Sequence, residues 1–546
     1  MTLTACTEDD GARLSQGTNL LELLEDAASG RGSVHFLASD PEPTPIRALW
    51  SASGDAARWI STKVGTGSTV ASILSNTRSC AIALLGAWRA GCTVASLPLP
   101  GRGMSAETYL EQLRRFCEAS CADALMVDPA HKALIPTPPA RVHTFEEVFS
   151  GGPPRSFDGG GALIQFTSGS VGTPKGIHLT LDAVGTNVAA ILSALEPRSG
   201  DSSCSWLPLS HDMGLIGLFL TPIAAGAPQF GHHRLALMTP EMFITNPGSW
   251  LRNCSDVGAT FTVVPNFALE LAVRTAGRLR PLDLSRLRAC IVGSESVRAA
   301  TLRRFTETFV PSGFDRRSFC PAYGMAEATV AVTVVRPDQP WRSISPDGSD
   351  GRVVANGKPP SELVSTGPPI DGVDVRVETE GGAIGPIEVR SPSLLDHYLA
   401  GELRLTADGY FPTRDLGMVE SGELFVLGRS DEVIIVAGRN VYPVDVEAAV
   451  TEPTVRRGCV AAIEAPGGGV AIVAEPRAHG LPMAELTKAC RLIRSAVARQ
   501  LGVAPVTVAF VPRGSLPKTP SGKLRRASIK SALTQGDAVL TREDFA

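Results

Sequence analysis

Apolar residues in the first part of the chain alternate between runs with helical spacing and short unbroken runs. Residues 79–89 form an apolar helical stretch, and residues 93–97 form a short run of the kind found in buried strands. This alternation is typical of βαβ units whose parallel strands are covered on both faces. It resumes at 162–167 and continues at 260–264 and 289–292. The pattern predicts an α/β fold whose large N-terminal domain contains two αβ subdomains.

The pattern changes near residue 373, where short alternating segments are separated by glycine turns. The segments lie at 373–377, 387–390 and 423–427. Period-two alternation of this kind predicts a small antiparallel β-subdomain.

A last unit follows the residues Gly428, Arg429, Ser430 and Asp431. It carries three strand-like runs and an amphipathic helix, at 433–436, 460–463, 470–474 and 483–501. We therefore predict an N-terminal domain at 1–428, a hinge at 429–431 and a small mobile α+β C-terminal domain at 432–546.

Composition excludes several classes of protein. The 546 residues are 43% apolar and carry a net charge of −4, which favours binding to neither nucleic acid nor anionic membrane. The first ten residues lack the basic and apolar pattern of a secretory signal, so a cytoplasmic location is expected. The most apolar run, 214–227, contains Pro222 and is shorter than the roughly 20 residues needed to cross a bilayer. It is interpreted as buried core.

The candidate chemistry begins directly after the strand-like run at 162–167. Residues 167–176 read Thr-Ser-Gly-Ser-Val-Gly-Thr-Pro-Lys-Gly, which gathers small residues, hydroxyls and one lysine. Such a loop can bind phosphate through backbone N–H groups. It does not match a Walker A loop, because Pro174 stands where that motif needs glycine. By itself the segment is equally compatible with a phosphate loop and with a flexible turn.

The segment does not stand alone. It resembles the phosphate-binding signature of the adenylate-forming superfamily, which includes acyl-CoA synthetases, nonribosomal-peptide adenylation domains and luciferases. Four later segments resemble other motifs of that superfamily, in the same order: the adenine and magnesium stretch, the ribose stretch, the hinge and the C-terminal lysine loop, at 322–329, 413–417, 428–431 and 517–526.

The resemblance implies ATP and Mg²⁺ as cofactors and assigns roles to individual residues. Lys523 would be the main catalytic cation, placed between the substrate carboxylate and the α-phosphate. Glu327, with Thr167, would hold Mg²⁺, and Asp415 would accept hydrogen bonds from the ribose. The implied cofactor-binding set is Thr167, Ser168, Gly169, Ser170, Gly172, Thr173, Lys175, Gly293, Ser294, Glu295, Ser296, Ala322, Tyr323, Gly324, Met325, Ala326, Asp415 and Arg429.

A further segment resembles one branch of the superfamily. Residues 206–217 contain a His-Asp-Met-Gly-Leu core similar to the acyl-pocket motif of fatty acyl-AMP ligases. The implied acyl site comprises His211, Asp212, Met213, Gly214, Asn266 and Phe267. We group His211 with Lys523 and Glu327 at the reaction centre. His211 would form a wall or a gate of the acyl pocket. A general base is not needed, because a carboxylic acid is already ionised at pH 7. A binuclear metal site at His211 and Asp212 is disfavoured, since no other ligands recur at suitable spacing.

The acceptor of the acyl group follows from the same branch. The Pro/Gly-rich segment at 336–360 resembles the insertion of acyl-AMP ligases, which implies transfer to the phosphopantetheine thiol of an acyl carrier protein. The C-terminal domain would turn about Asp431 and present the loop around Gly438 to that thiol. No partnership with nucleic acid or membrane is implied.

Four residues depart from the family pattern. Val171 replaces a threonine, Arg414 replaces a glycine, and Asp431-Glu432 replaces a Lys-Asp pair, as in some CoA synthetases. These changes are typical of a specialised relative, such as one in secondary metabolism. An acyl-CoA synthetase therefore remains the first alternative, and a non-catalytic acyl- or nucleotide-binding module the second.

Overall fold

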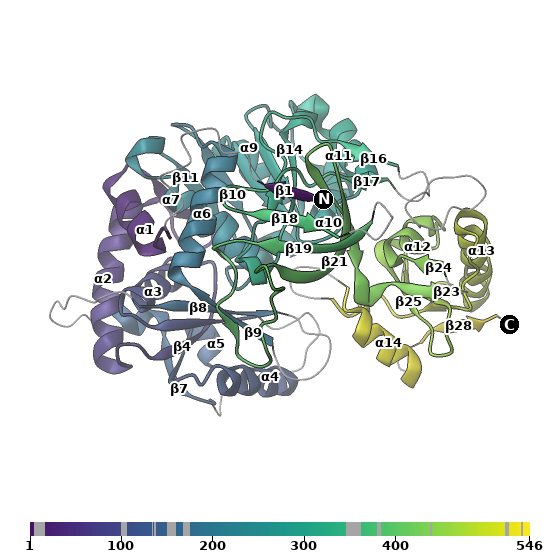
Figure 1. The fold of residues 1–546 in the computed structure, drawn as a ribbon, viewed down its shortest axis with the longest axis horizontal. Helices are drawn as coiled ribbons and strands as arrows, with labels where there is room; N and C mark the ends of the chain where they lie inside the picture. Colours follow the sequence, from purple (N-terminus) through teal and green to yellow (C-terminus); the bar gives the residue numbers. More distant parts are fainter. Residues whose placement is uncertain are drawn as a thin grey trace.

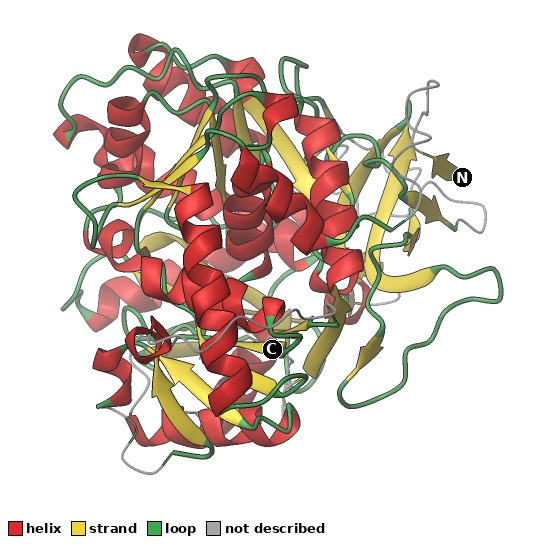
Figure 2. Cartoon of the chain, turned by 90° about the vertical axis from the view of Figure 1, so that its left-hand side faces the viewer, coloured by secondary structure: helices red, strands yellow, loops and turns green. Residues whose placement is uncertain are grey.

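The computed structural model divides into a large N-terminal domain and a smaller C-terminal domain, which lies at the right in Figure 1. Figure 2, turned by 90°, shows helices packed around the central sheets. The mixed α/β class is confirmed. The structure describes residues 1–4, 17–99, 106–133, 135, 138–149, 160–167, 175–345, 362–378, 384–436, 439–518, 524–536 and 539–545.

A seven-stranded sheet organises the first αβ subdomain, in the order β20-β9-β8-β5-β4-β6-β7. Its central strands are parallel, and most of their residues are buried, which explains their unbroken apolar runs. The strands are β4 (Thr69–Ile73), β5 (Thr93–Leu97), β6 (Ala124–Val127), β7 (Arg141–Thr144), β8 (Ala162–Thr167), β9 (Lys175–Thr180) and β20 (His397–Tyr398). The helices between them in sequence are α3 (Arg78–Arg89), α4 (Ala106–Ala119) and α5 (Pro129–Lys132), and α2 (Ile46–Lys63) precedes β4.

The second αβ subdomain contains an eight-stranded sheet, in the order β15-β14-β13-β12-β10-β11-β2-β3. Its strands are β2 (Ser33–Phe36), β3 (Thr44–Pro45), β10 (Ser202–Ser205), β11 (Arg234–Leu237), β12 (Phe261–Val264), β13 (Ala289–Val292), β14 (Phe319–Tyr323) and β15 (Thr333–Val334). Its helices are α1 (Leu20–Ser29), α6 (Leu181–Leu195), α7 (Thr221–Ala224), α8 (Pro240–Thr245), α9 (Gly248–Val257), α10 (Asn266–Thr275) and α11 (Ala299–Phe309).

The apolar run at 214–227 is buried, as predicted, but part of it has an unexpected backbone. Its first half belongs to a π-helix, η3 (Met213–Leu220), which leads directly into α7. π-Helical segments are rare and frequently occur at functional sites. Among the helices in the described part of the chain, none is long and apolar enough to cross a membrane.

The small β-subdomain is a five-stranded antiparallel sheet, as predicted. Its strands, in spatial order, are β1 (Thr2–Thr4), β18 (Asp374–Val377), β19 (Gly385–Arg390), β21 (Phe411–Glu420) and β22 (Glu423–Arg429). The edge strand β1 was not predicted. Its residue Leu3 pairs with Val375 of β18. The two paired strands are therefore separated by most of the sequence of the N-terminal domain. A separate pair, β16 (Ser343–Ile344) and β17 (Leu363–Val364), flanks the undescribed part of the predicted insertion.

The C-terminal domain has its own apolar core, which includes Ile434, Val446, Ile472, Ile493 and Val508. Helix α13 (Met483–Leu501) has the predicted bounds and covers the four-stranded sheet with its apolar face. The remaining elements are β23 (Ile434–Val436), β24 (Arg439–Val441), α12 (Pro443–Ala449), β25 (Val455–Glu464), β26 (Val470–Pro476), β27 (Thr507–Phe510), α14 (Arg526–Gln535) and β28 (Thr541–Asp544).

Candidate active site

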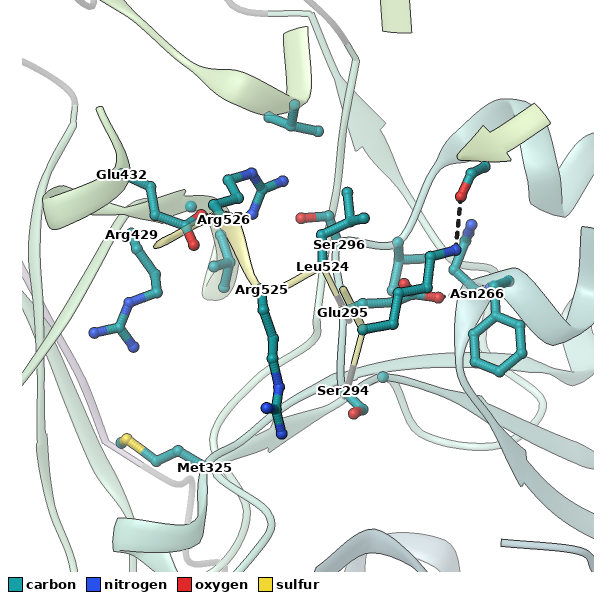
Figure 3. Close-up of a pocket in the computed structure, with 18 of the residues that line it drawn as sticks. Asn266, Ser294, Glu295, Ser296, Met325, Arg429, Glu432, Leu524, Arg525 and Arg526 are labelled. Atoms are coloured by element: carbon teal, nitrogen blue, oxygen red, sulfur yellow. Dashed lines mark hydrogen bonds and ion pairs between the residues drawn. The ribbon is translucent and has the colours of Figure 1, made fainter. Parts of the chain in front are cut away.

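A cavity of about 2790 Å³ lies where the three N-terminal sheets meet the C-terminal domain. Figure 3 shows part of it, with Asn266, Ser294 and Glu295 on one side and Arg429 on the other. Most of the predicted site residues line this cavity: Lys175, His211, Asp212, Met213, Asn266, Phe267, Gly293, Ser294, Glu295, Ser296, Ala322, Tyr323, Gly324, Met325, Ala326, Glu327, Asp415, Arg429 and Asp431. The fold therefore gathers segments from residue 175 to residue 431 around one space.

Some predicted residues lie elsewhere. Gly214 does not line the cavity. A Cβ atom there would lie 2.2 Å from the carbonyl oxygen of Pro208. Its role is close backbone packing at the start of η3. Thr167 ends β8, and nothing is described of its side chain. The residues Ser168, Gly169, Ser170, Gly172, Thr173, Gly438 and Lys523, and the departure Val171, lie outside the described residues.

Lys175 and Glu327 face each other in the cavity. The Lys175 Nζ atom lies 3.7 Å from Glu327 Oε1 and 3.7 Å from the ring centroid of Tyr398. The Tyr398 hydroxyl donates a 3.2 Å hydrogen bond to the same Glu327 oxygen. Burial lowers the pKa of Lys175, Glu327 opposes this, and Arg414 and Arg429 add to the lowering. These groups form a compact set of opposite charges suited to a polyanion and its counter-cation.

Tyr398 was not predicted as a site residue. It belongs to β20, a strand of only two residues that pairs with β9 beside Lys175. So short a strand carries no periodic signal. Its position beside Lys175 depends entirely on the strand pairing.

A second group joins two sheets. Tyr323, at the end of β14, donates a 2.6 Å hydrogen bond to Oδ2 of Asp415 in β21. Burial raises the pKa of Tyr323, and the Asp415 carboxylate raises it further. Asp415 also pairs in register with Arg429 on β22. One wall thus offers an aromatic ring, a carboxylate and a guanidinium, which suits a nucleoside with vicinal hydroxyls.

Arg414 stands in a backbone conformation that favours glycine. Its φ angle is +65°, in the left-handed region. An L-residue there costs roughly 1–2 kcal/mol, which accounts for the glycine that the ribose motif usually has. Because Arg414 also lines the cavity, the substitution adds a cation to its wall.

His211 and Asp212 bind each other at the start of η3. The His211 Nδ1 atom lies 2.5 Å from Asp212 Oδ1, which also accepts a 2.6 Å hydrogen bond from the Met213 backbone N–H. Asp212 therefore caps the π-helix and orients the His211 ring. This arrangement fits a wall or gate, which stays a prediction.

The loop at 293–298 is braced against the start of α10. Glu295 Oε1 accepts a 2.6 Å hydrogen bond from the Phe267 backbone N–H, and Asn266 Oδ1 accepts one of 3.0 Å from the Arg298 N–H. Ser294 has a φ angle of +68°, and its buried hydroxyl has no hydrogen-bond partner within the described residues. These bonds fix the wall opposite Arg429.

The C-terminal domain contributes the residues around the predicted catalytic lysine. Lys518 forms an isolated antiparallel bridge with Leu524, and both line the cavity. The Lys518 ammonium donates a 3.0 Å hydrogen bond to the Gly458 carbonyl. Arg525 extends into the cavity in Figure 3. The two ends of the undescribed segment 519–523 are thus anchored at the cavity wall.

The acidic residues at and directly after the predicted hinge form ion pairs with arginines. Arg429 donates two hydrogen bonds to Asp431, of 2.9 and 3.1 Å, which lower the pKa of that carboxyl. Arg526 donates one of 2.7 Å to Glu432 and one of 2.9 Å to Glu447. Asp431 is therefore paired with Arg429, the last residue of β22, and Glu432 is paired with Arg526, the first residue of α14.

Sequence comparison decides the family. A model of the family described as AMP-binding enzyme matches residues 25–399, more than two thirds of the chain. The chain belongs to the AMP-binding enzymes. It is an adenylate-forming enzyme, a class that uses ATP. A second model, described as Disco-interacting protein 2-like, AMP domain, matches residues 431–542 and so covers the C-terminal domain of this AMP-binding enzyme.

Several curated relatives of this AMP-binding enzyme are acyl-AMP ligases by name. The long-chain-fatty-acid–AMP ligase FadD26 of Mycobacterium marinum is 33% identical over 410 residues, covering 68% of this chain and 69% of its own. The 4-hydroxyphenylalkanoate adenylyltransferase of Mycobacterium tuberculosis is 30% identical over 576 residues, covering 94% and 91%. The medium-chain-fatty-acid–[acyl-carrier-protein] ligase JamA of Moorena producens is 32% identical over 408 residues, covering 69% and 68%.

A solved structure confirms the fold. It comes from a study of fatty acyl-adenylate ligases of E. coli and L. pneumophila, and it superposes with a TM-score of 0.86 at 24% identity, covering 96% of this chain and 99% of that one. The predicted family, fold class and enzyme class of this AMP-binding enzyme are therefore confirmed.

Proposed function

We propose that this enzyme uses ATP and Mg²⁺ to activate a largely apolar carboxylic acid as acyl-AMP, and then passes the acyl group to the phosphopantetheine thiol of an acyl carrier protein. One observation carries the proposal: the Lys175–Glu327 pair and the Tyr323–Asp415 pair line the same cavity. The names of the relatives support the acyl chain and the carrier protein.

In the first half-reaction a carboxylate oxygen attacks the α-phosphorus, and the bond to pyrophosphate breaks. Both reactants are anions, so fixed cations must relieve their repulsion. Lys523 would lie at the α-phosphate, and Lys175 with the 167–174 loop would hold the leaving pyrophosphate. Arg414 and Arg525, which line the same cavity, supply further positive charge.

The residues present fit a magnesium ion. Mg²⁺ prefers oxygen ligands and binds phosphates together with one or two carboxylates. The Glu327 side chain, only 18% exposed, is such a carboxylate in the cavity wall, and Thr167 at the end of β8 is the second proposed ligand. When bound, the ion would neutralise phosphate charge.

The nucleoside and the acyl chain take opposite parts of the cavity in this proposal. Tyr323 stacks on adenine, with the 293–296 loop at the other face, and Asp415 accepts from the ribose. The acyl chain lies against Met213 and Phe267, beside the apolar wall residues Ile191, Val263 and Ile291. His211 closes this part as a gate.

The second half-reaction requires the C-terminal domain to turn about Asp431, which withdraws Lys523 and brings the loop at Gly438 to the thiol. The ion pairs Arg429–Asp431 and Arg526–Glu432 flank the proposed pivot. The location we propose for the enzyme is the cytoplasm.

The first test concerns Lys523. Lys523→Ala is expected to abolish carboxylate-dependent exchange between ATP and pyrophosphate, because the α-phosphate loses its cation. Lys488→Ala, an exposed lysine on α13, is the matched control and retains exchange. Exchange near the wild-type rate in Lys523→Ala would exclude the assigned role.

The second test concerns the acceptor. Acyl-AMP formed on the enzyme is offered to a phosphopantetheinylated carrier protein or to CoA, and the thioesters are followed by intact mass. Faster transfer to the carrier protein is expected. Equal or faster transfer to CoA would favour an acyl-CoA synthetase, and no pyrophosphate release with any acid would favour a binding module.

A further inference from the structure

Two histidines and one aspartate meet where β20 lies against β9. His397 of β20 pairs directly with His178 of β9, and Asp396 immediately precedes β20. The two imidazole rings stack with their centroids 4.4 Å apart and their planes 21° from parallel. Asp396 Oδ2 lies 3.3 Å from His178 Nδ1 and 2.9 Å from His397 Nδ1. The strand pairing thus gathers three side chains of the types that bind transition metals.

The spacing of the three groups is close to that of a metal-binding set. One ligand atom from each side chain lies within 4.8 Å of the other two, and no other three histidine, cysteine or acidic side chains among the described residues are grouped so closely. Zinc binds imidazole nitrogen and carboxylate oxygen at about 2.0–2.2 Å, so two ligand atoms of a tetrahedral site lie about 3.3 Å apart. The distances of 3.3 and 2.9 Å to Asp396 Oδ2 match this separation to within a few tenths of an ångström.

The other two members of the cluster lie over the ligand atom of His178. His178 Nδ1 is buried and has no hydrogen-bond partner among the described residues. Asp396 lies beside this atom, and the ring of His397 stacks on that of His178. The side chains of Asp396 and His397 are 55% and 52% exposed, so their rotation at the surface admits an ion. Buried polar atoms are nearly always paired, and an ion held by all three side chains supplies the missing partner.

We propose that His178, Asp396 and His397 form a binding site for a divalent transition metal such as Zn²⁺. Two imidazole nitrogens and one carboxylate oxygen are a zinc ligand set, and a water molecule completes the tetrahedron on the exposed side. The metal takes the place of the proton between His397 and Asp396. The site is separate from the proposed magnesium site, because Mg²⁺ prefers oxygen ligands to imidazole nitrogen.

The proposed site lies on the reverse of the strand pair that carries Lys175 and Tyr398. Successive side chains of a strand point to opposite faces. Tyr398 follows His397, and Lys175 stands three residues before His178, so the two histidines face away from the contact between Lys175 and the Tyr398 ring. β20 has only two residues. A metal that links it to β9 stabilises this short strand, and with it the position of Tyr398 beside Lys175.

The test is a calorimetric titration of the enzyme with Zn²⁺ while Mg²⁺ is present in excess. The wild type is expected to bind one zinc ion at this site, and His397→Ala, which removes one of three ligands, should weaken its binding at least about tenfold. The exposed position of His397 makes misfolding of this variant a minor concern. Asp396→Asn keeps the shape of the side chain and should weaken binding as well. His232→Ala, at an exposed histidine outside the cluster, is the matched control and should bind zinc as the wild type does.

Two further measurements identify the ligands. Zinc should raise the unfolding temperature of the wild type and of His232→Ala, but not that of His397→Ala. Co²⁺ in place of zinc should give the absorption of a site with nitrogen and oxygen ligands, without the thiolate bands that binding at the exposed Cys121 would add. Absence of zinc binding, equal affinity in the wild type and His397→Ala, or cobalt bound through sulfur would overturn the proposal.

Discussion

The hydroxyl of Tyr323 donates a 2.6 Å hydrogen bond to Oδ2 of Asp415. The two residues belong to different sheets, β14 of the eight-stranded sheet and β21 of the five-stranded sheet. Burial raises the pKa of Tyr323, so the phenol keeps its proton and remains a donor across the physiological range. The bond fixes the ring proposed for adenine relative to the carboxylate proposed for ribose.

Removing this donor is expected to weaken ATP binding. Tyr323→Phe keeps the ring, but Asp415 loses a charge-assisted hydrogen bond, which is typically worth roughly 1.5–3 kcal/mol. We expect the KM for ATP to rise about tenfold or more. Tyr410→Phe is the control, because that ring packs on Arg376 and Arg390 and does not line the cavity. An unchanged KM for ATP in Tyr323→Phe would contradict the coupling.

Glu327 is expected to set the magnesium requirement. Glu327→Gln keeps the shape of the side chain and removes its charge, so the Mg²⁺ concentration at half-maximal pyrophosphate release should rise at least about tenfold. The control is Glu402→Gln, whose side chain is 78% exposed and pairs with Arg404. A magnesium titration that coincides with that of the wild type would remove Glu327 from the proposed ligands.

Variants of Arg414 are expected to affect the stability of the fold and the binding of ATP differently. Arg414→Gly and Arg414→Asn accept the left-handed backbone, so unfolding free energies should stay within about 1 kcal/mol of the wild type. Both remove a cation from the cavity, so the KM for ATP should rise. Arg414→Val should lower stability by a further ~1 kcal/mol or more, because a β-branched residue tolerates positive φ poorly. Denaturant unfolding and ATP titrations measure the two effects, and equal stability of all three variants would argue against the strained backbone.

His233 predicts a loss of stability in mild acid. Its pKa falls from about 6.5 in the unfolded chain to about 4 in the folded one, so below pH 6.5 only the unfolded state takes up this proton. The stabilisation from the neutral ring is complete above pH 6.5 and is lost progressively towards pH 4. At pH 5 the loss amounts to about 2 kcal/mol. The lowering is caused mainly by burial; Asp201 opposes it, and His232, Arg234 and Arg288 add to it.

The measurement is denaturant unfolding at pH 7, 6 and 5. His233→Phe removes this proton uptake, so the wild type should lose about 2 kcal/mol more than the variant between pH 7 and pH 5. Parallel losses in both proteins would show that His233 is not a buried neutral group.

Arg526 is expected to hold the start of α14 in place. Its guanidinium binds Glu432 and Glu447, and the Glu447 side chain is only 4% exposed. Arg526→Ala leaves that buried carboxylate with only the more distant Arg298, at 3.8 Å, as a paired cation, which should destabilise the C-terminal domain by about 3 kcal/mol. Arg542→Ala, which breaks a surface pair with Asp544, should cost less than about 1 kcal/mol. Hydrogen exchange in β25 and α12 reports the difference, and equal protection in both variants would contradict the prediction.

The sequence by itself determined the elements with strong periodicity and the motifs with local chemistry. The strand β5, the helix α13 and the strands β18, β19 and β22 of the β-subdomain follow from spacing alone, because the spacing of apolar residues reflects which faces are buried. Resemblance then named Lys175, Glu327, Tyr323 and Asp415, which the fold brings to one cavity. The roles of Lys523 and of the loop at 168–174 stay predictions, since those residues lie outside the described part of the chain.

Only the tertiary structure decided which of these side chains meet, and which others join them. Tyr398 reaches Lys175 through the pairing of a two-residue strand, and Arg414 is strained because it lies where the register between β19 and β21 shifts. His233, directly before β11, has the sequence surroundings of an ordinary core residue, and only the structure shows that its Nδ1 is buried without a hydrogen-bond partner among the described residues. Sequence spacing records which residues are buried, whereas the contacts between distant segments depend on register and packing, which no local pattern contains.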